Sequence, residues 1–229
     1  MACSPMSFAS LLPVAVCAGL LTAWSVLAQD GPEQRPGVHY SFDKEEPDVE
    51  EFDTDPGLAV TIEEGEVRVA GTTSDRNWRG DGIALSVEDK GGAAEVSGKF
   101  RLAKRRASGL VCLGLETERV GVLFLIFEWH PKKTAYWIQP SSLSIKSKLE
   151  NGRGALPPIW NEETDFNTLK VRLHPSRLSA EFLVNDTRID ALRLDEELGK
   201  VLSVRLVLQT PAQDREFDIR FDDLVVVFQ

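Results

Sequence analysis

The chain has few of the residues that build covalent or metal-centred frameworks. Its 229 residues include only 3 cysteines and 3 histidines, and none of them shows the spacing of a zinc site. Three cysteines are also too few for a disulfide-stapled fold. Cys3 and Cys17 lie near the start of the chain, whereas Cys112 lies in an apolar run without a basic neighbour. We therefore expect Cys112 to be a buried, unreactive thiol.

Basic residues are fewer than acidic ones, 26 against 36, which gives a formal net charge of −10. Nucleic acids and anionic membrane surfaces select basic proteins, so we expect neither as a partner. The imbalance is local, because residues 29–57 contain ten acidic and two basic residues. The rest of the chain, residues 58–229, is nearly neutral. We expect residues 29–57 to form a solvated acidic segment that includes a first strand at Val38–Phe42.

Charge is absent from the first 28 residues. An apolar stretch from Ser7 to Trp24 precedes Val26-Leu27-Ala28, which has the small residues of a cleavage site. This order predicts a secretory signal peptide at residues 1–28 and a secreted or periplasmic protein, not bound to a membrane after cleavage. An uncleaved segment of this length would instead be a membrane anchor. Nothing in the sequence indicates the oligomeric state.

Long helical periodicity is also missing, and β-type patterns take its place. About a dozen short strand-like runs follow one another from residue 58 to the end, separated by turn residues. This pattern predicts a single β-sandwich over residues 58–229. The one helical candidate is a run of about two turns at Leu192–Leu198, closed by Gly199. The fold class predicted is therefore all-β, with two antiparallel sheets and at most one short helix.

Two of the strand-like runs indicate which residues face the core. The segment Ala94–Leu102 alternates, so we expect Val96, Phe100 and Leu102 to point inward. The segment Val122–Phe127 is continuously apolar, which is typical of a central strand covered on both faces.

Turn and strand motifs recur in four segments of the chain: Ile62–Val69, Phe166–Ile189, Val204–Gln209 and Phe217–Val226. Within the second segment, Asn185-Asp186 matches the tight turn of a hairpin, where both residues need positive φ. These motifs resemble those of the concanavalin A-like jelly-roll superfamily. Within that superfamily they are most similar to the laminin-G-like lectin modules and the 3-keto-disaccharide hydrolase domain.

This resemblance implies three alternative functions. The first is an exported module that binds a glycan or polysaccharide through exposed aromatic residues on its concave face. The second is a glycan-active hydrolase similar to the 3-keto-disaccharide hydrolases. The third is a structural or protein-interaction module without a sugar site. We favour the first, because the sequence resembles the fold but lacks the hydrolase motif, and keep the other two as alternatives, because one fold hosts many functions.

The sequence lacks the catalytic motif of the glycosidases in this superfamily, Glu-x-Asp-x-Glu on one strand. The nearest match is Glu216-Phe217-Asp218-Ile219-Arg220, which has arginine in the third position. Whether the chain is an enzyme therefore stays open. If it is one, Glu128 and His130 are the candidate catalytic residues, because they flank a tryptophan at the end of the apolar strand.

Aromatic residues beside polar ones are the candidates for a sugar site, since pyranose rings stack on aromatic faces. Trp78 and Arg79 lie in a polar, loop-like segment, and Trp129 and Trp137 end or begin strand-like runs. These four residues are the predicted ligand-binding set.

No cofactor is predicted, and the one metal considered is calcium, which prefers oxygen ligands. Its candidate ligands are Asp218, Asp222 and Asp223 near the C-terminus. No EF-hand pattern surrounds them, and a charge run is usually a solvated face.

Overall fold

The computed structural model describes residues 37–43, 49–52, 55–74, 80–89, 92–104, 108–130, 133–140, 147–155, 165–209 and 213–229. The chain divides into two units, residues 1–34 and 35–229, and all described residues belong to the second. The predicted signal peptide lies outside them. The described ranges hold no helix with the length and hydrophobicity needed to cross a membrane.

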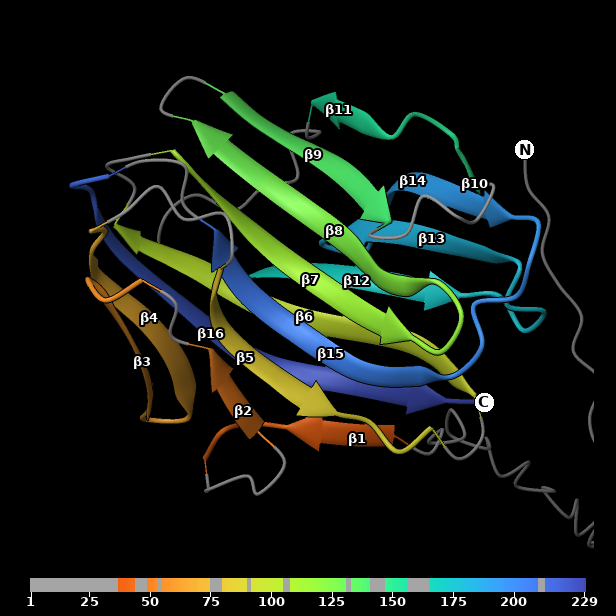
Figure 1. Ribbon diagram of the computed structural model, residues 1–229, viewed down its shortest axis with the longest axis horizontal. Helices are drawn as coiled ribbons and strands as arrows, with labels where there is room; N and C mark the ends of the chain where they lie inside the picture. The colour runs from red at the N-terminus through yellow and green to blue at the C-terminus, as the bar shows by residue number, and fades with distance from the viewer. Residues whose placement is uncertain are drawn as a thin grey trace, which may run out of the picture. The chain divides into compact units, whose positions relative to one another are not determined.

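The described residues of the second unit form two antiparallel sheets that pack face to face (Figure 1). The prediction of an all-β sandwich is confirmed. The eight strands along sheet A are, in spatial order, β10 (Ser147–Leu149), β14 (Thr187–Leu194), β13 (Ser179–Val184), β12 (Asn167–Leu173), β6 (Ala93–Lys104), β16 (Glu216–Phe228), β4 (Glu66–Thr72) and β3 (Leu58–Glu63), and β1 (Gly37–Tyr40) also pairs with β16.

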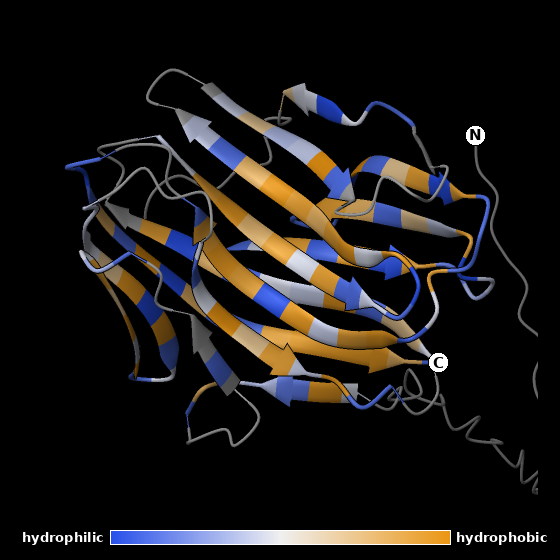
Figure 2. Cartoon of the chain, viewed as in Figure 1, coloured by the Kyte–Doolittle hydropathy of each residue, from blue (hydrophilic) through white to orange (hydrophobic). Residues whose placement is uncertain are grey.

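Sheet B has seven strands among the described residues. Their order is β11 (Arg153–Ala155), β9 (Lys133–Pro140), β8 (Gly121–His130), β7 (Gly109–Thr117), β15 (Val201–Gln209), β5 (Asp81–Ser86) and β2 (Val49–Phe52). Figure 2 shows long hydrophobic runs on β7 and β8, whereas hydrophilic and hydrophobic residues alternate along β4. Continuous runs need cover on both faces of the sheet, and alternation needs it on one face only.

The main core lies between the sheets and is built from alternate residues of the strands. Val96, Phe100 and Leu102 point into it, as the alternation of β6 predicts. Phe100 contacts Phe127 of sheet B, with ring centroids 5.4 Å apart. Burying a side chain of this size contributes about 1.5–3 kcal/mol to stability. The aromatic side chains with less than 2% of their surface exposed, among the described residues, are Phe100, Phe127, Trp129, Phe182, Phe217 and Phe221.

Tight turns set the register of the hairpins. Asn185 and Asp186 both have positive φ, 46° and 61°, and connect β13 to β14. The predicted two-residue turn is therefore confirmed. Asn185 also accepts a hydrogen bond from the Thr168 backbone amide at 2.8 Å, which joins the turn to β12.

The acidic segment contributes one strand to each sheet. β1 pairs with the end of β16, so that Gly37 lies opposite Val227, and β2 pairs with β5. Tyr40 and Phe42 are buried in the main core. The sandwich therefore includes residues that precede Leu58.

The predicted short helix at 192–198 is wrong. Leu192 and Leu194 are the last buried residues of β14, and Leu192 lies opposite Ala180 of β13. Leu198 is buried beyond the strand, in a segment without regular structure that also contains Gly199, whose φ is +73°. The apolar spacing that suggested a helix thus comes from alternation in a strand followed by one inward-facing loop residue.

Candidate functional site

Sheet B carries a second apolar cluster on its outer face, the face turned away from sheet A. Leu110, Cys112, Ile126 and Val207 are buried in this cluster and contribute nothing to the main core. Phe124 and Trp137 are partly buried and pack against it. In the apolar segment of β8, Leu123, Leu125 and Phe127 are buried in the main core, whereas on the outer face Ile126 is buried and Val122 and Phe124 are partly buried. The predicted cover on both faces is therefore complete on the core side and partial on the outer side.

The register aligns these residues in a row across the sheet. Trp137 of β9 lies opposite Ile126, Ile126 opposite Cys112, and Cys112 opposite Val207. Arg153 of β11 extends the row beyond Trp137 at the edge of the sheet. The row therefore runs from an apolar centre to an aromatic and charged edge.

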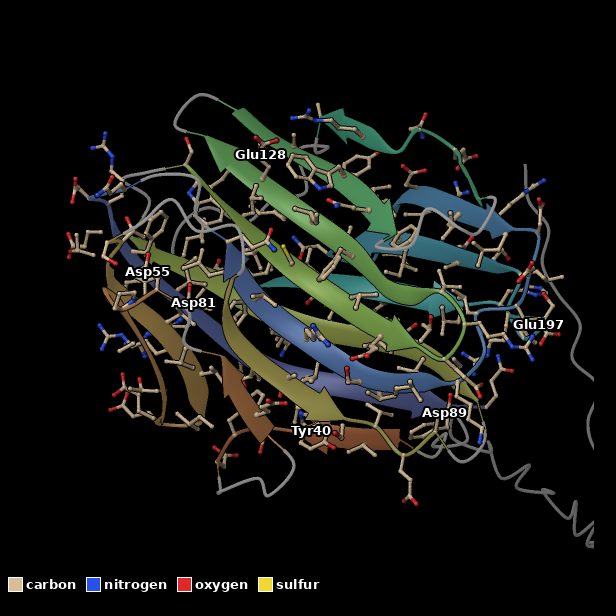
Figure 3. The ribbon with its side chains drawn as sticks, viewed as in Figure 1. Tyr40, Asp55, Asp81, Asp89, Glu128 and Glu197 are labelled. Carbon is tan, nitrogen blue, oxygen red and sulfur yellow. The ribbon has the colours of Figure 1, made fainter. Side chains whose placement is uncertain are left out.

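Trp137, Glu128 and Arg153 form a compact group at this edge, which we call the Trp137 corner. Arg153 Nη2 donates to Glu128 Oε2 at 2.8 Å. The guanidinium carbon of Arg153 lies 4.9 Å from the centroid of the Trp137 ring, within the range of a cation–π contact. Figure 3 shows Glu128 near the end of β8. The corner thus places an aromatic ring, a carboxylate and a guanidinium together.

A group of three polar residues lies at the other end of the outer face of sheet B: Glu116, Ser203 and Arg205. Glu116 Oε2 accepts hydrogen bonds from Ser203 Oγ at 2.8 Å and from Arg205 Nη2 at 2.7 Å. These two hydrogen bonds hold the pKa of the Glu116 carboxyl below its ordinary value, against a smaller opposing effect of burial. Glu116 is therefore a paired carboxylate at neutral pH.

The carboxylates of this face are far apart. Leu110 lies opposite Glu128 in the register, and Glu116 follows six residues later on β7. At about 3.3 Å per residue, the two carboxylates are about 20 Å apart. Glycosidases need a pair separated by about 5–10 Å. Glu116 and Glu128 therefore cannot act together on one glycosidic bond.

The buried side chain of Asp190 fixes the turn that precedes Arg153. Asp190 accepts hydrogen bonds from the backbone amides of Asn151 at 3.1 Å and Gly152 at 2.8 Å. The Gly152 carbonyl in turn accepts from the Ile138 amide of β9 at 2.9 Å. The position of Arg153 is therefore set by backbone contacts as well as by Glu128.

The structure brings together two of the predicted site residues, Trp137 and Glu128. Trp129 does not belong with them, because its side chain is 0% exposed and packs between Phe127 and Phe217 in the main core. In the sequence, Trp129 alternates with Leu123, Leu125 and Phe127. This two-residue period predicts that all four side chains face the same core. Trp78, Arg79 and the side chain of His130 lie outside the described residues.

The three candidate calcium ligands lie on β16 in sheet A, and two of them are ion-paired there. Asp218 binds the Arg68 guanidinium through both carboxylate oxygens, at 3.1 and 2.9 Å. Asp223 pairs with Lys99 and with His39. Within the described ranges, no three His, Cys, Asp or Glu residues lie close enough together to hold a metal ion.

Sequence reasoning missed Arg153 and Asp190. Arg153 lies on a three-residue edge strand, too short to produce a periodic signal. Asp190 is one of several acids in a polar stretch, and its burial depends on contacts with a turn far away in the sequence. Gly152, with φ of +75°, was the one local sign of a turn there.

Solved structures that are similar to this chain over most of its length show which fold this is. The catalytic domain of an endo-1,3-β-glucanase (laminarinase) from Thermotoga petrophila is 10% identical, with a TM-score of 0.58 over 85% of this chain and 98% of that chain. A β-glucanase from Bacillus licheniformis is 10% identical, with a TM-score of 0.57 over 86% and 100%. The fold is the concanavalin A-like jelly roll.

A third jelly roll of this kind is the CBM2 module of the evolved Dit protein of Lactobacillus casei phage J-1. It is 9% identical, with a TM-score of 0.57 over 86% of this chain and 99% of that chain. No protein-family model matches the sequence. No curated protein matches it either.

Proposed function

We propose that the chain is an exported jelly-roll module that binds carbohydrate on the outer face of sheet B. The observation that carries this proposal is the Trp137 corner, where an aromatic ring borders an apolar floor and lies beside Glu128 and Arg153. A sugar ring has apolar faces and a rim of hydroxyls, so it needs this combination of an aromatic surface and charged hydrogen-bonding groups. Trp78 and Arg79 remain predicted members of the same site.

The structural neighbours support a glycan as the partner class. Two of them are named as glucanases and one as a CBM2 module. Because identity is near 10%, these names support the choice of ligand class and no individual residue role.

Binding is favoured over hydrolysis by the spacing of the carboxylates. Besides Glu116 and Glu128, the register places Glu50 on this face, opposite Ala84 of β5. Glu50 is four strands away from β8, which is about 19 Å at 4.8 Å per strand. No two of these carboxylates on the described strands have the separation that two-carboxylate hydrolysis needs.

The test is a glycan array with residues 29–229, followed by calorimetric titration of the best ligand. Trp137→Ala should weaken binding at least tenfold, whereas Trp137→Phe should retain it. The reason is that, within the described part of the chain, the indole Nε1 is buried and has no hydrogen-bond partner. Trp137 therefore offers a ring face and no donor.

Arg188→Ala is the matched control, because Arg188 forms a similar exposed ion pair with Glu150 on sheet A. Failure to bind any glycan, or binding indifferent to Trp137→Ala, would reject the proposal and favour a protein-interaction module. Each bound glycan should also be incubated with the protein and its products separated. Turnover that disappears in Glu128→Gln would show a hydrolase instead.

A further inference from the structure

We infer that the ligand is an anionic saccharide, whose carboxylate or sulfate ester binds the Arg153 guanidinium while its sugar ring lies against Trp137. This inference rests on the proposed function and specifies the class of glycan. It follows from the exposure, the hydrogen bonding and the structural support of a single residue, Arg153.

The side chains of Arg153 and Glu128 differ in how much of their surface is exposed to solvent. The Arg153 side chain is 61% exposed, whereas that of Glu128 is 13% exposed. Glu128 is thus the more enclosed partner, and its hydrogen bond to Nη2 helps to hold Arg153 in place. A ligand that approaches from solvent meets the cation before it meets the carboxylate.

Most of the donors of Arg153 are unused. Among the described residues, the hydrogen bond to Glu128 uses Nη2 and the contact with Trp137 uses the flat face of the guanidinium. The N–H groups of Nε and Nη1 make no hydrogen bond in this part of the chain. A guanidinium presents its donors in a planar fork that matches the two oxygens of a carboxylate or sulfate. A neutral sugar hydroxyl would use only one of these donors.

The guanidinium is also held in position before any ligand binds. Asp190 fixes the turn before β11, Glu128 fixes one nitrogen, and the Trp137 ring limits rotation of the plane. Ordering a free arginine side chain on binding has an entropic cost, so prior ordering improves the affinity for an anion. Arg205, at the opposite end of the face, is the less exposed partner of its own pair, 31% against 37% for Glu116.

The experiment is a glycan array that contains neutral, uronic-acid and sulfated oligosaccharides, followed by titration of the best binder and its neutral form. The neutral form is made by carboxyl reduction or methyl esterification of a uronate, or by desulfation of a sulfate ester. We expect an anionic best binder, and a loss of at least tenfold in affinity when the ligand is neutralised. The uronic-acid and sulfated arms identify which anion is recognised.

Arg153→Gln should produce the same loss with the anionic ligand and little further loss with the neutral one, because both changes remove one interaction. Arg153→Lys should recover part of the affinity, since it keeps the charge and loses the planar fork. Arg188→Gln is the matched control and should leave both affinities unchanged.

Two outcomes separate failure of this inference from failure of the proposed function. If the best binders are neutral, or if Arg153→Gln weakens neutral and anionic ligands equally, the anionic class is wrong and carbohydrate binding stands. If no glycan of any class binds, the proposed function itself is rejected.

Discussion

The Asp190 carboxylate accepts a hydrogen bond from the backbone amide of Gly152 at 2.8 Å. Asp190 belongs to β14 of sheet A, and Gly152 precedes β11 of sheet B, so this bond links the two sheets at their edge. The Tyr136 hydroxyl adds a second link by donating to the Ile189 carbonyl at 2.9 Å. Burial raises the pKa of Tyr136, and the charges of Asp190 and Glu150 raise it further. This hydroxyl therefore stays a donor at neutral pH.

Asp190→Ala should lower the free energy of unfolding by about 1–3 kcal/mol, because it leaves the part-buried backbone donors of Asn151 and Gly152 without their acceptor. Asp190→Asn keeps one carbonyl oxygen and should cost less. Urea denaturation followed by tryptophan fluorescence measures both. An alanine variant as stable as the wild type would mean that water satisfies these amides.

Substitution of Trp129 should change stability without changing glycan affinity, whereas substitution of Trp137 should change glycan affinity. Trp129→Ala should cost about 3–5 kcal/mol in urea denaturation, because it empties a large core site. Gly109→Ala should destabilise by about 1–3 kcal/mol, since a Cβ there would lie 2.5 Å from the Trp129 ring. At temperatures where both variants remain folded, glycan affinity should be near that of the wild type. A loss of glycan affinity in Trp129→Ala but not in Gly109→Ala would show that Trp129 belongs to the binding site after all.

Stability should fall in acid partly through Glu66. Burial raises the pKa of Glu66, but hydrogen bonds and charge from Arg220 and Arg101 outweigh burial and hold the pKa below its ordinary value. A depressed pKa stabilises the fold above the unfolded value of about 4.3, and this stability is lost as the pH falls through the folded value. Glu66→Gln should lower stability at pH 7 and flatten the decline below pH 5.

Asp222 gives the matched opposite case. Burial raises the pKa of its carboxyl, and the neighbouring charge of Asp223 contributes in the same direction. The charged carboxylate then lowers the stability of the fold at neutral pH. Relative to the wild type, Asp222→Asn should therefore raise the free energy of unfolding more at pH 7 than at pH 3. The asparagine oxygen can still accept from the Asp223 amide, as Asp222 does at 2.7 Å. If the free energy of unfolding changed with pH in the same way in Glu66→Gln and Asp222→Asn, the opposite pKa shifts assigned to Glu66 and Asp222 would be contradicted.

Cys112 should be inert in the folded protein. Burial raises the pKa of its thiol well above the ordinary value, and the side chain is fully enclosed in the apolar cluster of sheet B. In a chain with Cys3 and Cys17 replaced by serine, a disulfide reagent should label Cys112 only after denaturation. Rapid labelling without denaturant would show that the cluster opens.

The fold was predictable from local signals that repeat along the chain. Alternation in β6 identified Val96, Phe100 and Leu102 as core residues, and Asn185-Asp186 identified the hairpin turn. These features depend on the two-residue period of a strand and on the φ that a tight turn requires, both of which are local.

The candidate site was only partly predictable, because it depends on strand pairing. Trp137 and Glu128 lie in strand-like runs that the sequence itself shows. Arg153 comes beside them only through the pairing of β11 with β9, which the sequence does not show. The error at Trp129 has a simple cause: residues next to each other on β8 point to opposite faces, so Glu128 and Trp129 cannot share a site.

The pairing of Gly37 with Val227 has a consequence for how the domain folds. This ladder joins residues from opposite ends of the domain, so β1 cannot dock until β16 has been synthesised and has joined sheet A. Contacts of such long sequence separation carry a high loop-closure cost and slow the approach to the native state. The last step of assembly should be the docking of β1, with Tyr40 as its anchor in the core (Figure 3). Until that step, the edge of β16 beside Leu224 and Val226 remains open to strands from other molecules.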